Sequence, residues 1–232
     1  MTTRSGEGAI LAVDVGGSHV KLRISSGPTI RRFASGPTFT PPELIEGICR
    51  TTADWGYDRV TIGYPGPVHD NAPVRDPAHL GPGWVGFDYA TALGAPVQIL
   101  NDAAMQALGS YQGGRMLFLG LGTGLGSALV LDGLVQPTEL AHLPYRKKRS
   151  FEDYVGERGL ERLGRNRWRR AARDVVHRLA EALQTDYVVI GGGNGRLLKE
   201  TAFRGDVRLG DNSNAFIGGF RVWQAGAATR KE

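Results

Sequence analysis

Two glycine-rich turns, far apart in the chain, contain residue types that bind phosphate groups. The first (residues 14–17, Asp-Val-Gly-Gly) follows an apolar run at 10–15, and the second (122–124, Gly-Thr-Gly) follows an apolar run at 116–121. Glycine leaves room for backbone N–H groups to approach an anion. Segments of this kind also occur as plain hairpins without a ligand. If the two turns face each other, they form a clamp for a phosphate chain.

Asp102 is the residue best placed to act as a base. It follows Asn101 and the apolar run 96–100, and it precedes an expected helix over 103–111. A carboxylate at a helix N-terminus stays ionised and can accept the proton of a hydroxyl group. Beside a phosphate clamp, it indicates phosphoryl transfer to a hydroxyl. Taken alone, however, the position favours a helix N-cap with no chemistry.

Other residues beside the turns can also contact phosphates or a nucleotide. Asp14, at a strand end, can hold Mg²⁺ through water, and Lys21 can reach a phosphate. An Asp that only caps a hairpin turn explains Asp14 equally simply. A third glycine run, 191–195, follows an apolar strand at 187–190. It can lie against a nucleotide base or ribose, or it can simply connect a strand to a helix.

Glu139 and His142 have a spacing that can place both on one face of a helix as metal ligands. Pro137 and Pro144 flank them and disfavour a helix. In a loop, the two side chains are better suited to sugar hydroxyl groups. His142 by itself is equally well explained as a structural histidine.

Composition and missing motifs exclude several classes of protein. The chain has 232 residues, 41% of them hydrophobic, which is enough for one large domain or two small lobes. With Cys49 alone, no intramolecular disulfide or cysteine-based zinc site can form, and a reducing cytoplasm is expected. Asp14 interrupts the first apolar run, so no signal peptide is expected, and the five glycines in 116–135 argue against a membrane span. P-loop, dinucleotide-binding and protein-kinase motifs do not occur.

Positive charge is concentrated in one part of the chain. The net charge is +5, yet residues 146–178 alone hold 12 Lys/Arg against 5 Asp/Glu, a difference of +7. Such a run can line a track for a polyanion, although charge runs are usually solvated helix faces. Nucleic-acid binding is disfavoured because no recognised module is present.

Strand and helix patterns alternate, which predicts the α/β class. Hairpin strands are expected on both sides of each of the first two turns, and a long ordered loop is expected over 69–88. Further helices are expected over 41–55, 151–163, 168–183 and 215–225.

Together these pieces resemble the ROK family of sugar kinases. The matching motifs, in family order, are Asp14-x-Gly-Gly-Ser-x-x-Lys21, Gly63-x-Pro-Gly66, Pro82-Gly-Trp84, Asn101-Asp102-Ala103, Gly122-Thr-Gly124, Glu139-x-x-His142 and Gly191-Gly-Gly193. The resemblance implies a two-lobed actin/hexokinase-like (ribonuclease H-like) α/β fold, with the sugar in the interlobe cleft. It implies a smaller lobe over 1–100, joined by a helix at about 215–232, and a larger lobe over 101–214.

The resemblance also implies a role for each matched residue. Asp102 is similar to the base that deprotonates the sugar 6-hydroxyl. The expected sugar-binding residues are Gly66, Asn101, Asp102, Glu139, His142 and Glu152. The expected phosphate- or nucleotide-binding residues are Asp14, Gly16, Gly17, Ser18, Lys21, Gly122, Thr123, Gly124, Gly192 and Gly193, with Asp14 as an Mg²⁺ ligand through water.

The chain departs from the family pattern at a few positions. The cysteine-rich zinc motif of many members is absent, so no zinc site is expected, and Glu152 falls at the place of a sugar-binding glutamate. Ala141 and Ala104 replace a glycine and an asparagine of the family pattern. Neither change removes a group that transfers protons.

Loss of the zinc motif in a short chain is similar to the polyphosphate glucokinase branch. That likeness predicts transfer from polyphosphate, ATP or both to glucose, in a cytoplasmic homodimer that uses Mg²⁺. The expected polyphosphate track consists of Lys147, Lys148, Arg167 and Arg170. An ATP-only hexokinase for mannose, N-acetylglucosamine or fructose, and a non-catalytic sugar-binding protein, remain as alternatives.

Overall fold

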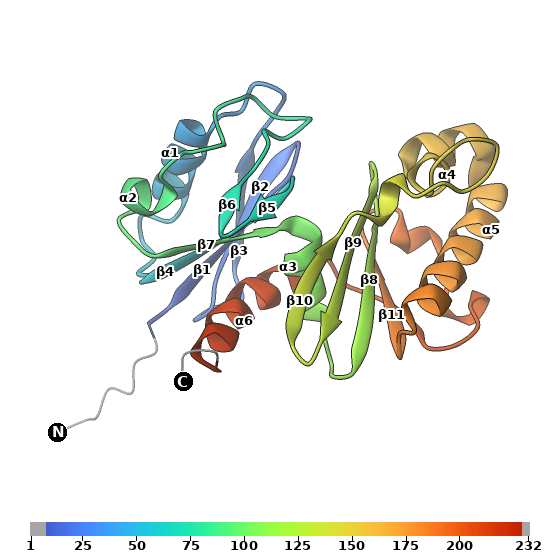
Figure 1. Cartoon of the computed structure of the whole chain (residues 1–232). Coiled ribbons are helices and arrows are strands. Elements are labelled where there is room, and N and C mark those ends of the chain that lie inside the picture. The colour runs from blue at the N-terminus through green and yellow to red at the C-terminus, as the bar shows by residue number, and fades with distance from the viewer. Residues whose placement is uncertain (1–7, 229–232) are drawn as a thin grey trace. The chain divides into compact units, whose positions relative to one another are not determined.

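The computed structural model describes residues 8–228, with side chains to residue 224 (Figure 1). The chain divides into two compact units, each with its own sheet and core. Unit 1 runs to Asp102 and resumes at Gly219, and unit 2 comprises Ala103–Gly218. The chain therefore passes from one unit to the other at Asp102 and returns at Gly218.

Unit 1 is built on a five-stranded sheet of order β3-β2-β1-β4-β7. Neighbours in β3-β2-β1 are antiparallel, and β4 and β7 add in parallel to β1. The unit begins in the blue part of Figure 1. Its strands are β1 (Ile10–Val15), β2 (His19–Ile24), β3 (Ile30–Ala34), β4 (Arg59–Tyr64), the short hairpin β5 (Val68–His69) and β6 (Ala72–Pro73), and β7 (Val97–Asn101), and its helices are α1 (Pro41–Thr51) and α2 (Tyr89–Leu93).

The core of unit 1 explains why the long loop before α2 is ordered. Trp84 is completely buried, and its indole N–H donates to Gly81 O at 2.7 Å. Asp76 accepts the Trp84 backbone N–H at 2.8 Å, which folds the loop over the side chain. The predicted loop over 69–88 also contains the β5–β6 hairpin, which its prolines and lack of periodicity did not reveal.

Unit 2 repeats the same sheet order with different strands, β10-β9-β8-β11-β12. Here too, antiparallel neighbours are followed by two parallel strands. The strands are β8 (Arg115–Leu121), β9 (Leu125–Leu131), β10 (Leu134–Thr138), β11 (Tyr187–Gly191) and β12 (Val207–Leu209). The helices are α3 (Asp102–Ser110), which begins at the last residue of unit 1 before the crossing, α4 (Glu152–Val155) and α5 (Glu157–Leu183), with 3₁₀ turns η1 (Leu140–His142), η2 (Gly195–Leu197) and η3 (Glu200–Ala202). Helix α6 (Asn214–Ala228) begins in unit 2 and continues into unit 1, which resumes at Gly219.

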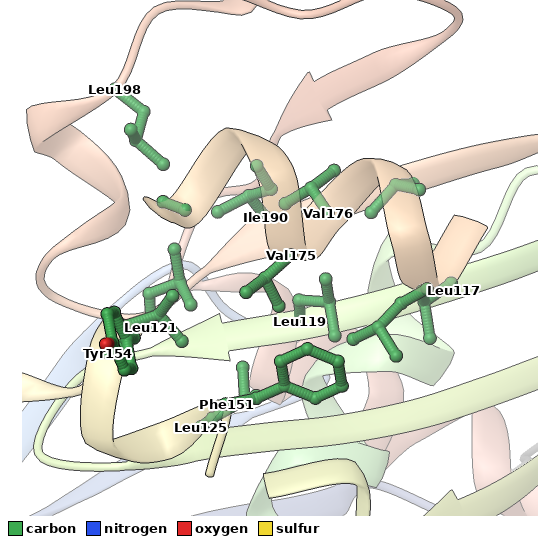
Figure 2. Close-up of a cluster of buried hydrophobic side chains, with 14 of the residues drawn as sticks. Leu117, Leu119, Leu121, Leu125, Phe151, Tyr154, Val175, Val176, Ile190 and Leu198 are labelled. Carbon is green, nitrogen blue, oxygen red and sulfur yellow. The ribbon is translucent and has the colours of Figure 1, made fainter. Parts of the chain in front are cut away.

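Apolar side chains cover both faces of the unit 2 sheet. On one face, Val175 and Val176 of α5 pack with Leu117 and Leu119 of β8, as Figure 2 shows. On the other face, the small side chains of α3 pack against Phe118 and Val130. Ala104 belongs to this second cluster and is 1% exposed, so an apolar side chain fits where the family pattern has asparagine.

The break predicted between helices 151–163 and 168–183 is present, at Gly164, whose backbone is not helical and whose φ of 70° only glycine adopts easily. The first predicted helix was wrong in one respect, because Gly156, which has extended backbone, divides it into α4 and the first part of α5. The buried side chain of Trp168 packs the second part of α5 into the core of unit 2. Among the described residues, no helix is both long and apolar enough to cross a bilayer.

Candidate active site

The first glycine turn joins β1 to β2, and two hydrogen bonds hold the backbone of Gly16. Gly16 N–H donates to His19 O at 3.1 Å, and the Ser35 hydroxyl donates to Gly16 O at 2.6 Å. Gly17 and Ser18 are exposed. The predicted phosphate-binding residues therefore form an ordered turn whose outer side is open to an anion.

Asp14 and Lys21 form a cross-strand pair beside this turn. They are register partners on β1 and β2, and Lys21 Nζ lies 3.4 Å from Asp14 Oδ2. Burial raises the pKa of the Asp14 carboxyl, and the charge and hydrogen bond of Lys21 oppose that rise. Lys21, predicted to reach a phosphate, thus lies against the carboxylate predicted to bind Mg²⁺. A bound cation would compete with Lys21 for Asp14.

The second glycine turn joins β8 to β9 in unit 2, and α4 and α5 support it. Gly122 N–H donates to Gly124 O at 3.1 Å. Glu152 Oε2 accepts the Leu125 N–H at 3.0 Å, and Glu157 N–H donates to Thr123 O at 3.2 Å. Glu152, predicted as a sugar ligand, therefore holds the end of the phosphate turn with one of its carboxylate oxygens.

The third glycine run packs directly on the second turn. Gly192 has φ +80°, and a Cβ there would lie 2.3 Å from Leu121 O, so only glycine fits. Asn194 ties the two segments, because its backbone N–H donates to Leu121 O at 2.9 Å and its amide donates to Gly122 O at 3.2 Å. The structure thus brings the predicted residues of 122–124 and 192–193 into one ordered set of backbone groups.

Asp102 lies where β7 ends and α3 begins. The preceding residue, Asn101, donates from its side-chain amide to Gly66 O at 3.1 Å, which joins two of the predicted sugar-binding residues. A Cβ at Gly66 would lie 2.8 Å from the Tyr64 ring, so this close approach requires glycine. The carboxylate is partly exposed at the first residue of a helix. The helix dipole at that position favours its ionised form.

Asn71 is a residue of this site that sequence reasoning missed. It lies in the β5–β6 hairpin with φ 63°, and its amide bonds the outer edge of β7 twice. Nδ2 donates to Val97 O at 2.9 Å, and Oδ1 accepts the Ile99 N–H at 2.6 Å. Because β7 is the last strand of its sheet, this side chain takes the place of a neighbouring strand. The only sequence signal was an Asp-Asn pair typical of a turn.

Glu139 and His142 lie together on the surface of unit 2. His142 Nε2 is 3.5 Å from Glu139 Oε1, and each side chain is 73% exposed. A 3₁₀ turn, not an α-helix, carries them. Within the described residues, no group of three or more His, Cys, Asp or Glu could hold a metal ion. Their polar atoms are accessible to a ligand such as a sugar.

The structure separates the predicted basic track into two parts. Lys147 and Lys148 lie in a tight turn with φ 51° and 58°, bounded by the Pro144–Ser150 bridge. Arg167 and Arg170 instead line an open hollow of about 390 Å³ on α5. Arg146, which begins the basic run 146–178 but is not one of the four expected track residues, lines the same hollow. We call this the arginine hollow, and its lining residues are Arg146, Tyr154, Leu163, Arg167, Arg170, Ala171 and Asp174.

Comparison with known proteins shows which enzymes the chain is similar to. No family model matches the chain. A polyphosphate glucokinase of Mycobacterium tuberculosis is 28% identical over 206 residues, covering 79% of this chain and 77% of that protein. The inorganic polyphosphate/ATP-glucomannokinase of Arthrobacter sp. superposes with a TM-score of 0.78 over 94% of this chain and 99% of that one, at 20% identity. A ROK family glucokinase of Streptomyces griseus, solved with glucose and AMPPNP, superposes with a TM-score of 0.68 over 93% and 99%, at 17% identity.

The chain is similar in sequence to polyphosphate glucokinases and in structure to ROK sugar kinases. Its fold is the two-lobed, actin-like fold of these enzymes, which confirms the predicted fold class. These relatives and structural neighbours are glucokinases and other sugar kinases, which are hexokinase-type phosphotransferases. The glycine turns, Asp102 and the Glu139–His142 pair are the residues from which a specific reaction is proposed below.

Removal of the Asn71 amide tests whether β7 needs its outer support. Asn71→Gly keeps the left-handed backbone and deletes both hydrogen bonds, so we expect a Tm lower by about 2–6 °C and a kcat that falls several-fold. The KM for sugar should change little, because Asn71 only positions the strand before Asp102. Thermal unfolding and steady-state kinetics measure both.

Asp70→Gly is the matched control for that variant. Asp70 is the adjacent residue with positive φ, and its carboxylate lies at the surface beside His69. This variant should leave kcat unchanged. Equal losses of kcat in both variants would contradict a positioning role for Asn71.

Replacement of Asp14 should separate stability from activity. A pKa raised in the folded state means that the native protein binds a proton more tightly than the unfolded chain, so stability falls as pH rises above the unfolded pKa of about 4. At pH 7 the buried charge is unfavourable, so Asp14→Asn should raise Tm by up to about 4 °C. The gain should vanish near pH 4, and turnover should fall by about 10²-fold.

Asp54→Asn provides a control in which the pKa of the replaced carboxyl is shifted in the opposite direction. The Arg31 guanidinium lowers the pKa of the exposed Asp54 carboxyl to about 2, so its contribution to stability is present above the unfolded pKa and is lost as pH falls through about 2. This variant should not gain stability and should keep full activity. A lower Tm in Asp14→Asn at pH 7 would overturn the prediction.

Proposed function

We propose that this protein transfers a phosphoryl group from inorganic polyphosphate, and also from ATP, to the 6-hydroxyl group of glucose. The observation that carries the proposal is the position of Asp102, a partly exposed carboxylate at the junction of β7 and α3. Polyphosphate is part of the names of the M. tuberculosis and Arthrobacter proteins, and glucose was bound to the S. griseus protein. The glycine turns supply backbone groups suited to either donor.

In the proposed reaction, Asp102 is the general base. The 6-hydroxyl oxygen forms a bond to the terminal phosphorus while the bond from that phosphorus to the bridging oxygen breaks. The hydroxyl proton moves to Asp102, and the shortened donor leaves with the bridging oxygen. Alignment of the attacking oxygen, phosphorus and leaving oxygen accounts for much of the rate in reactions of this type.

The proposed sugar ligands come from both units of the chain. Asn101 and the Gly66 segment belong to unit 1, where the Asn101 amide already bonds Gly66 O. Glu139 and His142 belong to unit 2, and their high exposure leaves their polar atoms free to bond hydroxyl groups. Glu152 has one oxygen on Leu125 N–H and a second oxygen with which to reach a sugar.

The proposed donor site consists of the two glycine turns and Asp14. Mg²⁺ usually keeps several waters and takes one or two carboxylates together with phosphate oxygens, so one buried carboxylate beside a glycine turn fits it. When bound, Mg²⁺ neutralises charge on the phosphate oxygens. Gly16, Gly17 and Ser18 would contact the donor in unit 1. In unit 2, residues 122–124 and 192–193 would do so.

A grid of donors and sugars tests the proposal against its alternatives. Purified protein is assayed with polyphosphate or ATP and with glucose, mannose, N-acetylglucosamine or fructose. The highest kcat/KM should occur with polyphosphate and glucose, and ATP should also support turnover. Product with ATP but not with polyphosphate would support the alternative of an ATP-only hexokinase. Sugar binding by calorimetry without product from any pair would leave the non-catalytic sugar-binding protein.

Asp102→Asn tests the base directly. The amide keeps the size of the side chain and can still cap α3, so the fold and the sugar affinity should be retained. Loss of the base should lower kcat by a factor on the order of 10²–10⁴. Turnover with each donor, together with sugar binding by calorimetry, measures the effect.

Asp88→Asn controls for the change of charge at a helix start. Asp88 caps α2 by accepting the Thr91 N–H at 3.0 Å. This variant should keep kcat. Near-normal turnover in Asp102→Asn would show that Asp102 only caps α3.

Glu139→Gln tests the proposed sugar contacts. It keeps the size of the side chain but weakens hydrogen bonds to hydroxyl groups, so the KM for sugar should rise roughly 10-fold or more while the KM for the donor changes little. Glu161→Gln, at an exposed position of α5, is the control. Equal rises in both KM values would contradict a role in sugar binding.

A further inference from the structure

The arginine hollow lies where α4, α5 and the loop before α4 meet in unit 2. Arg167 and Arg170 are three residues apart on α5, so they project on the same side of the helix. Arg146 reaches the hollow from the preceding loop, and Tyr154 and Leu163 contribute apolar surface. The hollow is therefore an open concave surface with guanidinium groups from two segments.

The positive charge of the hollow is incompletely neutralised. Asp174 is the one acid among its lining residues, and other groups already occupy it. It accepts from the Tyr145 hydroxyl at 2.6 Å, from Arg178 Nε at 2.8 Å and from Arg146 Nη2 at 3.1 Å. Within the part of the chain that the structure describes, neither Arg167 nor Arg170 has an ion pair or side-chain hydrogen bond. The guanidinium groups of Arg167 and Arg170 are therefore available to bind an anion.

The kink in α5 adds to this positive potential. Helical backbone restarts after Gly164, only three residues before Arg167. The positive end of the helix dipole thus lies beside the unpaired arginines. Planar guanidinium groups bind phosphate oxygens with paired hydrogen bonds, which makes phosphate the ligand chemistry that fits this surface.

The short helix α4 connects the hollow to the second glycine turn. Glu152, its first residue, bonds the Leu125 N–H of that turn, and Tyr154, two residues later, lines the hollow. A four-residue helix is about 6 Å long. The two surfaces are therefore contacted by residues two positions apart on one short helix of the same unit, and a chain of several phosphate groups is long enough to reach both.

We propose that the arginine hollow binds the distal part of a polyphosphate chain whose reacting end lies at the glycine turn. This inference rests on the proposed function, because it gives a binding site to the part of the polyphosphate donor that lies beyond its reacting end. ATP has three phosphates and no further chain to place there. The hollow thus discriminates between donors by length, and it favours long chains over tripolyphosphate and ATP.

The test combines kinetics with direct binding. The double variant Arg167→Gln/Arg170→Gln is compared with Arg165→Gln/Arg173→Gln, which removes the same charge from the same helix at positions that do not line the hollow. KM is measured for long-chain polyphosphate, tripolyphosphate and ATP with glucose. Calorimetry measures the affinity for long-chain polyphosphate without sugar, at low and high salt, and unfolding curves check the fold.

In the hollow variant, we expect the KM and the Kd for long-chain polyphosphate to rise roughly 10-fold or more. The affinity should also depend less steeply on salt, because fewer counterions are released. Tripolyphosphate and ATP kinetics should stay within about 2-fold of wild type, as a length-dependent subsite requires. The control variant should show much smaller changes with every donor.

Three results would overturn the inference. The first is equal loss of long-chain affinity in both double variants, which would reduce the effect to net charge. The second is an equal rise of KM for ATP and long chains in the hollow variant. The third is single-stranded RNA that binds as tightly as polyphosphate and weakens equally in the hollow variant. Wild-type protein without turnover on any donor would instead refute the proposed function, and calorimetry would still test the hollow.

Discussion

The support of strand β7 is the constraint on which the rest of the site depends. The chain leaves unit 1 directly after this strand, and Asp102, which carries the proposed base, is the last residue before unit 2. On one side, β7 pairs in parallel with β4, and on the other, the Asn71 amide replaces a missing neighbour. A base must be held within a fraction of an ångström of its proton donor, and a strand bonded on both edges provides that rigidity.

The two units present the proposed phosphate-binding turns with one topology. Each sheet has the same order, and each places a glycine turn between its central strand and an antiparallel neighbour. The turns differ in what supports them. In unit 1, Asp14 and Lys21 lie beside the turn, whereas in unit 2 the turn bonds Glu152 and Asn194. The same kind of glycine turn thus lies beside an ion pair in unit 1, whereas in unit 2 it is surrounded mainly by groups that bond its backbone.

The unit 2 turn also connects the reaction to the basic helix. Glu152 ties the turn to α4, and α4 leads through Gly156 into α5. Arginines that are paired, such as Arg178 with Asp174, stabilise this region, while Arg167 and Arg170 remain available. A single short helix therefore contacts both the proposed phosphate turn and the proposed tail subsite. In the charged loop before this helix, Tyr145 is well packed, because its ring contacts Tyr154 and its hydroxyl donates to Asp174.

Local patterns in the sequence determined the α/β class, both glycine turns and the strand-to-helix junction at Asp102, because each depends on neighbouring residues and on the steric freedom of glycine. Only the tertiary structure decided which side chains support these parts. Asn71 reaches β7 across 26 residues of chain, and Arg146 joins Arg167 and Arg170 in the hollow while Lys147 and Lys148 do not. The structure also added a break at Gly156 to the one expected between residues 163 and 168, which lies at Gly164. Such contacts depend on the direction of each side chain after the sheet and helices have packed, and neither the composition nor the spacing of a charged run contains that direction.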